Sequence, residues 1–235
     1  PGQIYNSNAV MLASMLRGWG CDVQTGPPVP DNSRASRDAL ARAAEAADLV
    51  VSTGGVSVGE ADTIRDAVAA LGTIDLWRVA IKPGKPFACG QVLGTPFLGL
   101  PGNPASTFVT LTMLAGPYIK RLQGREPEAY DRHCVAAGFS VSEPSSRTEF
   151  LRVYLQNDGF QEARSSSLGA SDASVKVQQQ EQNGDRERVA VPLPNQSSGV
   201  LSALSQAHAL AEVVQGDVIA AGEPVIVYPC AQFLW

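Results

Sequence analysis

The spacing of apolar residues in the first half of the chain alternates between helical and strand patterns. Apolar positions recur on one face of residues 7–18, a helix that Asn6 or Ser7 can cap. The other predicted elements are strands over 21–24, 48–52, 76–81 and 96–100, and helices over 33–47, 63–71 and 104–122. This alternation predicts an α/β domain built on a parallel sheet. Because the domain begins on a helix, we expect its first strand to be missing and the chain to be part of a longer protein.

The pattern changes at Gly124-Arg125-Glu126-Pro127, and short β-like pieces follow. These pieces cover residues 150–155, 188–191, 218–220 and 224–228. They predict a small all-β domain over residues 131–235, after an α/β domain over residues 1–130. The polar stretch 156–190 has too little apolar content for a core element, and we expect it to form a long hairpin loop.

Composition narrows the classes of partner. The chain has 235 residues, 44% of them hydrophobic and 17% charged, which is enough for a substantial core. The net charge is -5 and Lys and Arg are scattered singly, so neither nucleic acid nor an anionic membrane is favoured. No apolar run approaches the ~20 residues of a membrane span. The four separated cysteines and two histidines offer no zinc-ligand spacing. We therefore expect a soluble cytoplasmic protein with reduced thiols, which binds anions locally.

The strongest local signal is a strand that passes into a small-residue loop and then a helix, Ser52-Thr53-Gly54-Gly55-Val56-Ser57-Val58-Gly59-Glu60-Ala61-Asp62. Ligands of open α/β sheets bind at the carboxyl ends of strands, where glycines let backbone N–H groups approach phosphate. The segment matches neither the dinucleotide pattern G-x-G-x-x-G nor the G-K-[ST] of a P-loop. The alternative is a tight connection whose glycines serve only packing.

Carboxylates stand near two predicted strand ends. Asp62 can cap its own helix, which is the ordinary role of Asp at such a position. Together with Glu60, and with Asp31 after the preceding strand, it could instead hold a hard cation such as Mg²⁺ against phosphate oxygens. Carboxylates on two strand-end loops favour the cation site over a lone cap.

Two further segments are candidate anion sites. In Lys82-Pro83-Gly84-Lys85-Pro86, Pro and Gly occupy the central positions of a type II turn, which would bring the two lysines together. The alternative is that the lysines only solvate a surface turn. In the segment from Leu98 to Ser106, Asn103 is an N-cap and Pro104 a first helical residue. Ser106 in the first turn suits an oxyanion, although the same residues would also make a good cap for stability alone.

Taken together, the motifs S-T-G-G-V-S-V-G-E-A-D, I-K-P-G-K-P-F and L-P-G-N-P-A-S resemble the molybdopterin molybdenumtransferase family, which includes bacterial MoeA and the corresponding domains of gephyrin. Further matches lie at residues 2–5, 195–201 and 221–225. The resemblance implies a three-layer, parallel-sheet, MogA-like molybdopterin-binding domain followed by a small β-barrel domain. It also implies a homodimer with a composite active site. A family motif T-G-D-E lies just upstream of the start of this chain, so we expect the chain alone to be inactive or impaired.

The resemblance also implies residue roles. Asp31 and Asp62, with Glu60, match the adenylyl-pterin and Mg²⁺ end, and the pterin and phosphate loop is Thr53, Gly54, Gly55, Ser57 and Gly59. The molybdate-facing residues and the prolines that shape their pocket are Lys82, Lys85, Pro86, Ser106, Pro101, Pro104, Arg152 and Ser198. Asn195-Gln196-Ser197-Ser198 departs from the usual Q-G-S, which leaves Ser197 or Ser198 open. Asn32 replaces a frequent second Asp, and Arg78 stands near a position often held by Lys.

The implied reaction is insertion of molybdenum into adenylylated molybdopterin with release of AMP, in molybdenum cofactor biosynthesis. Asp31, Asp62, Lys82 and Lys85 would be its catalytic residues, with Mg²⁺ as cofactor. Other enzymes of that pathway are candidate partners. One alternative is a molybdopterin adenylyltransferase, which should bind ATP rather than molybdate. Another is a non-catalytic pterin-binding scaffold.

Overall fold

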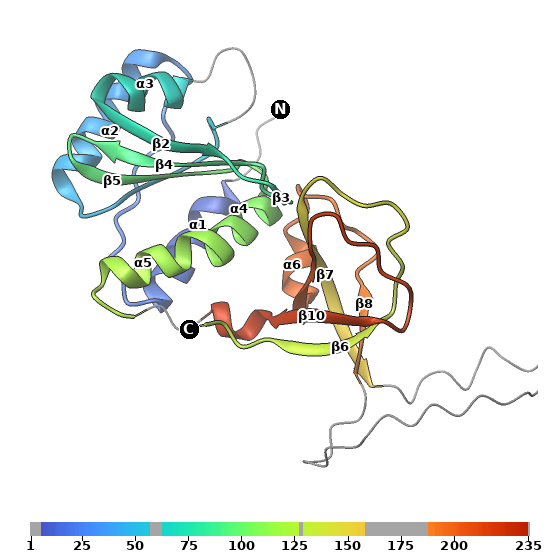
Figure 1. The fold of residues 1–235 in the computed structure, drawn as a ribbon. Helices are drawn as coiled ribbons and strands as arrows, with labels where there is room; N and C mark the ends of the chain where they lie inside the picture. Colours follow the sequence, from blue (N-terminus) through green and yellow to red (C-terminus); the bar gives the residue numbers. More distant parts are fainter. Residues whose placement is uncertain (1–5, 57–62, 127–128, 158–187, 235) are drawn as a thin grey trace, which may run out of the picture.

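The computed structural model describes residues 6–56, 63–126, 129–157 and 188–234. We call residues 6–126 the α/β region and residues 129–234 the β region. The α/β region has a sheet in the order β1-β5-β4-β2, formed by Val50–Thr53 (β1), Thr95–Leu100 (β5), Pro86–Val92 (β4) and Gly72–Arg78 (β2). Figure 1 shows helices packed on both sides of this sheet.

The sheet is mixed, so the prediction of a parallel sheet is wrong. β1 and β5 are parallel, whereas β4 is antiparallel to both β5 and β2. Between β4 and β5, Leu93 and Gly94 both have positive φ, as in the two-residue turn that favours a tight hairpin. Leu-Gly is not a typical sequence for this turn, and the hairpin strand β4 was therefore missed.

The predicted helices of the α/β region are confirmed. They are Ser7–Gly18 (α1), Ser33–Ala46 (α2), Thr63–Leu71 (α3), and a long helix formed by Pro104–Thr110 (α4), Leu111–Ala115 (η1) and Gly116–Leu122 (α5). Asn6 caps α1 and Asn32 caps α2, each accepting a hydrogen bond from a backbone N–H. The strand predicted over 21–24 is wrong. A strand needs a hydrogen-bonded neighbour, and among the described residues none pairs with this segment.

Two apolar clusters explain how the helices are placed on the sheet. α2 and α3 pack through Leu40 and Val68 on a cluster that includes Phe97 of β5. α1 and the long helix contribute Leu16 and Val109 to a second cluster, which includes Leu98, the next residue of β5. Because successive residues of a strand face opposite sides, the two helix groups cover opposite faces of the sheet.

The β region contains a closed five-stranded barrel in the order β7-β8-β6-β10-β9, which closes through β7 and β9. Its strands are His133–Ala137 (β6), Thr148–Asn157 (β7), Arg188–Pro192 (β8), Ala209–Val213 (β9) and Pro224–Pro229 (β10). The predictions over 150–155, 188–191 and 224–228 are confirmed. The predicted piece 218–220 is only an isolated bridge between Val141 and Ile219. β6 and β9 were not predicted, and neither were the helices Ser202–Gln206 (α6) and Cys230–Phe233 (η2).

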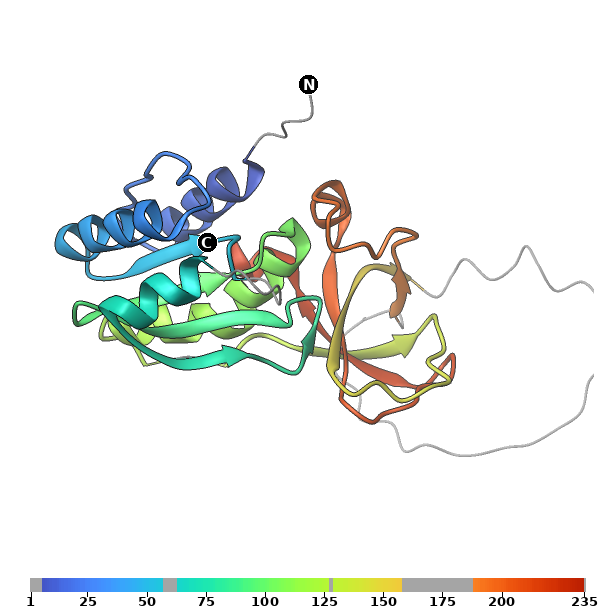
Figure 2. The same ribbon diagram turned by 90° about the horizontal axis from the view of Figure 1, so that it is seen from above.

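The two regions share one apolar junction, and Figure 2 shows them side by side. Phe233 lies at its centre, with edge-on ring contacts to Phe108 and Tyr130, and its carbonyl accepts a hydrogen bond from Trp19 Nε1 at 3.0 Å. The strand Ile81–Lys82 (β3) leaves the α/β region and pairs in parallel with β7. Ring contacts, a hydrogen bond and strand pairing therefore join the two regions. None of the helices in the described residues is long and apolar enough to cross a membrane.

Candidate functional site

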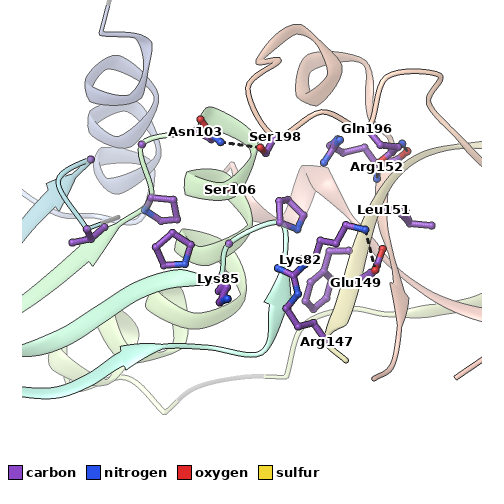
Figure 3. Close-up of a pocket in the computed structure, with 18 of the residues that line it drawn as sticks. Lys82, Lys85, Asn103, Ser106, Arg147, Glu149, Leu151, Arg152, Gln196 and Ser198 are labelled. Carbon is purple, nitrogen blue, oxygen red and sulfur yellow. Dashed lines mark hydrogen bonds and ion pairs between the residues drawn. The ribbon is translucent and has the colours of Figure 1, made fainter. Parts of the chain in front are cut away.

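A cavity of about 510 Å³ lies between the two regions. From the α/β region it is lined by residues 54–56, 82–86, 101–103 and 106, and from the β region by residues 147, 149–152, 196 and 198. Figure 3 shows side chains from both regions converging on it. The three sequence motifs, which are far apart in the chain, therefore meet at one cavity, and the β region completes its wall.

The strand-end loops after β1 and β5 lie next to each other because these two strands are parallel neighbours. Gly54 N–H donates to the carbonyl of Leu100 at 3.0 Å. A Cβ on Gly102 would stand 3.5 Å from the Cα of Gly54, so the two loops touch through backbone. Gly54 and Gly55 have φ values of 80 and 70, a conformation that glycine adopts without strain. Gly54, Gly55 and Gly102 all line the cavity, so backbone forms much of this wall.

Thr53 holds the two loops together and does not line the cavity. Its hydroxyl donates to the carbonyl of Pro101 at 2.9 Å and accepts from Asn8 Nδ2 at 2.9 Å. Asn8 is 6% exposed, and its Nδ2 also lies 2.8 Å from the Gly102 carbonyl. Asn8 was missed because a lone Asn near the start of a helix looks like a capping residue. A polar residue on the buried face of α1 was the available signal.

The turn at Lys82–Lys85 is not the predicted type II turn. The Lys82–Pro83 peptide is cis, and Gly84 has φ 128. A Cβ at Gly84 would lie 2.6 Å from Thr110 Cγ2, so the turn packs closely on α4. Both lysines nevertheless line the cavity, as does Pro86. The prediction that the lysines face one anion site stays a prediction, and the turn geometry behind it is different.

Arg152 is the most unusual residue of the site. It is 1% exposed and lines the cavity, and its Nη2 lies 3.5 Å from the carbonyl of Ser197. Its Nε has no hydrogen-bond partner and its guanidinium forms no ion pair within the part of the chain that the structure describes. Burial lowers the pKa of this guanidinium, because it disfavours the charged form. An unpaired buried cation is costly, and an anion in the cavity would relieve this cost.

Gln196 fixes the backbone of Arg152. Its Oε1 accepts from Arg152 N–H at 3.0 Å and its Nε2 donates to the Arg152 carbonyl at 2.8 Å. The side-chain amide thus makes the two backbone hydrogen bonds that a neighbouring strand would make. It was missed as a site residue, although it lies in the motif Asn195-Gln196-Ser197-Ser198. Of the two serines left open by the sequence, Ser198 lines the cavity.

The start of α4 contacts the β region directly. Ala105 N–H donates to the Ser198 carbonyl at 2.9 Å, and Asn103 Nδ2 donates to Ser198 Oγ at 2.9 Å. Asn103 is the N-cap residue, but its side chain makes no capping hydrogen bond, and its amide nitrogen instead contacts Ser198. Pro104 stands at the first helical position as predicted and does not line the cavity, whereas Pro101 and Ser106 do.

Charge is unevenly distributed in the cavity. Its described lining contains four cationic side chains, Lys82, Lys85, Arg147 and Arg152, against one carboxylate, Glu149. Glu149 accepts an ion-paired hydrogen bond from Lys82 at 3.1 Å. Arg147 and Glu149 were missed, and their alternation along the start of β7 was the available signal. The excess of cations makes this cavity suited to an anion.

Asp31, the one predicted carboxylate ligand that the structure describes, does not line this cavity. Asp31 is exposed, and its Oδ1 accepts a hydrogen bond from Thr63 Oγ1 at 2.9 Å, beside the start of α3. Ser57, Gly59, Glu60 and Asp62 lie outside the described residues. Within the described residues, no cluster of three or more His, Cys, Asp or Glu side chains could hold a metal ion.

Comparisons with known proteins agree with the motifs. A family model described as a probable molybdopterin binding domain matches residues 1–121, and another described as the MoeA C-terminal region (domain IV) matches residues 173–230. The chain is 38% identical over 167 residues to a molybdopterin molybdenumtransferase of Haemophilus influenzae, which covers 70% of this chain and 41% of that protein. It is 34% identical over 164 residues to molybdopterin molybdenumtransferase 2 of Mycobacterium tuberculosis, covering 67% and 40%.

A solved structure has the same fold. The crystal structure of a molybdopterin biosynthesis MoeA protein from Pyrococcus horikosii superposes with a TM-score of 0.71 at 26% identity. The match covers 97% of this chain and 49% of that one. The chain thus spans about half of this structure and about two fifths of the two relatives. Because the first family model matches more than half of its residues and a MoeA C-terminal region follows, the chain belongs to the MoeA family of molybdopterin-binding proteins.

Proposed function

We propose that the cavity between the two regions binds the substrate molybdate, and that the chain is part of a molybdopterin molybdenumtransferase. The whole protein would insert molybdenum into adenylylated molybdopterin and release AMP. The observation that carries this proposal is Arg152, a buried guanidinium that forms no ion pair with any described residue and lines the cavity. We take the oxyanion to be molybdate because the relatives are named molybdopterin molybdenumtransferase.

Each side chain of the cavity would have a simple task. Molybdate is a tetrahedral dianion, so its site needs hydrogen-bond donors and positive charge without bulk. Arg152 would give a fixed, planar set of donors, because burial leaves its side chain little freedom. Lys82 and Lys85 would place positive charge near the oxyanion on flexible side chains, and the hydroxyls of Ser106 and Ser198 would donate hydrogen bonds. The cavity residues would act by orienting the oxyanion and balancing its charge.

The pterin end of the site would be the glycine loop after β1. Gly54 and Gly55 line the cavity, and backbone N–H groups of such a loop suit phosphate. We propose Asp31, with Glu60 and Asp62, as ligands of Mg²⁺, because a hard cation prefers carboxylate oxygens. The support within the described residues is the exposed carboxylate of Asp31 beside the start of α3. When bound, Mg²⁺ would neutralise charge on the phosphates of the adenylylated pterin.

The rest of the protein would complete both the fold and the reaction. We propose that residues 1–130 and 131–235 are two domains, the first a three-layer unit of the MogA type. The two helix groups on opposite faces of the sheet support this arrangement. β1 pairs with β5 alone among the described strands, so its other edge is available to a strand from the missing part. Activity of this chain alone would therefore be absent or strongly reduced. The adenylyltransferase alternative is not favoured by the relatives.

Calorimetric titration with molybdate tests this function. The wild-type chain should bind molybdate, and Arg152→Met should weaken binding by roughly 100-fold, because a buried cation is lost from the site. Arg42→Met is the matched control, since Arg42 is exposed on α2 and lies outside the cavity. If the folded wild-type chain binds no molybdate, or if the two variants weaken it equally, the proposal is wrong.

A further inference from the structure

Lys82 and Glu149 are paired where the two regions meet. β3 runs parallel to β7 with Lys82 opposite Glu149 in the register. Lys82 Nζ donates to Glu149 Oε1 at 3.1 Å, and the two side chains are 52% and 20% exposed. The ion pair therefore lies at the wall of the cavity, partly in solvent, and backbone pairing keeps its two residues adjacent (Figure 3).

Glu149 is unexpected in a site for a dianion. It is the one carboxylate among the described residues that line the cavity. A carboxylate beside a bound dianion repels it, and the repulsion is stronger in a partly desolvated cavity than in water. The same carboxylate also forms an ion pair with Lys82, one of the four cations that line the cavity. Arg152, by contrast, has no ion pair within the described part of the chain.

We propose that Glu149 is an internal counterion that holds Lys82 while the cavity is empty and sets the affinity of the cavity for its oxyanion. When a tetrahedral dianion binds, Lys82 turns from Glu149 to the dianion. Only non-covalent contacts change, so no proton, electron or leaving group is involved. The inference rests on the proposed function, because it assigns to Glu149 the control of that same oxyanion site.

This change of partner by Lys82 also couples oxyanion binding to the contact between the two regions. Lys82 belongs to β3, which leaves the α/β region, and Glu149 belongs to β7 of the barrel. Ion pairs with solvent contact contribute little to stability, so this one can be given up at small cost. Four cations with no opposing carboxylate would bind any tetrahedral dianion more tightly than the observed set. Glu149 thus lowers affinity without changing the shape of the cavity.

The test compares oxyanion affinity in three forms of the chain. Wild type, Glu149→Gln and the control Glu143→Gln are titrated with molybdate and with sulfate by calorimetry, at low and high salt. Glu143 is an exposed carboxylate of the same region and lies outside the cavity. We expect Glu149→Gln to bind both dianions about tenfold more tightly at low salt, with a smaller gain at high salt, as is typical of a charge effect. Glu143→Gln should match wild type.

The outcomes separate this inference from the function on which it rests. If wild type binds molybdate and Glu149→Gln binds it equally or more weakly, the counterion role is wrong and the ion pair only joins the two regions. A purely structural pair would lower the melting temperature of Glu149→Gln and leave affinity unchanged. If Glu149→Gln does not fold, Glu149→Asp, whose shorter side chain draws the carboxylate back from Lys82, should still gain affinity. Absence of molybdate binding in wild type would overturn the proposed function itself.

Discussion

The two regions contribute cations to the cavity in different ways. The α/β region offers Lys82 and Lys85, which are exposed side chains on a turn. The β region offers Arg152, which is 1% exposed and whose backbone N–H and carbonyl are both bound by the side chain of Gln196. An exposed lysine is already satisfied by water, whereas a buried guanidinium without an ion pair is not. In the proposed site, the barrel would therefore set the position of the oxyanion, and the lysines would add charge around it.

The largest effect is expected from Arg152→Met. Removing a buried cation should abolish the stabilisation that molybdate gives, while the ligand-free protein should melt at the same temperature or higher. The reason is that the buried guanidinium forms no ion pair with any described residue, so an apolar side chain of similar length relieves an uncompensated charge. Thermal melts with and without molybdate measure both effects. A large drop in the ligand-free melting temperature would show that Arg152 mainly supports the fold.

Gln196→Ala should have the next largest effect. It removes the two side-chain hydrogen bonds to the backbone of Arg152, at 3.0 and 2.8 Å. We expect a loss of about 1–3 kcal/mol in the free energy of unfolding, because partly buried backbone groups lose their partners. Molybdate affinity should fall as well, because Arg152 is no longer held in place. Gln206→Ala, at an exposed position of α6 outside the cavity, is the control. Equal losses in the two variants would mean that Gln196 has no special role.

Asn8→Ala tests the opposite wall of the cavity. Asn8 Nδ2 contacts Thr53 Oγ1 at 2.9 Å and the Gly102 carbonyl at 2.8 Å, so it joins the loops after β1 and β5. Its loss should cost about 1–2 kcal/mol in the free energy of unfolding, since these partly buried acceptors lose a donor. Chemical denaturation measures this cost, with Ser14→Ala, an exposed position on α1, as the control. Molybdate affinity should change little if the barrel positions the oxyanion. A loss as large as that of Arg152→Met would mean that the α/β region positions it instead.

The sequence predicted most of the helices and less of the sheets, for a physical reason. Helices such as α1 and α2 are specified locally, by apolar spacing and by the caps Asn6 and Asn32. Strand direction depends on pairing partners that local patterns do not show, so β4 was missed and the sheet was predicted as parallel, although β4 and β5 form an antiparallel hairpin. The strand β9 was missed because its small residues, Ala209 and Ala211, are buried by barrel closure.

The residues of the candidate site were predicted with the same limitation, because contacts between distant parts of the chain are not visible in the sequence. Motif residues such as Lys82 and Ser106 were found because each motif is contiguous in sequence. Arg147 and Glu149 were missed because their place in the cavity depends on the parallel pairing of β3 with β7, which links residues 67 positions apart. Gln196 was missed for a related reason, since its role is visible only once its contacts with the Arg152 backbone are known.

The smallest effect is expected from Lys85→Met. The side chain is exposed and forms no ion pair with any described residue, so its loss should leave the melting temperature unchanged. Molybdate affinity should fall by about tenfold or less at low salt, and by less still at high salt, because salt screens an exposed charge. Titrations at two salt concentrations check this, with Arg42→Met, an exposed cation on α2 outside the cavity, as the control. A loss equal to that of Arg152→Met at both salt concentrations would mean that the turn, rather than the barrel, positions the oxyanion.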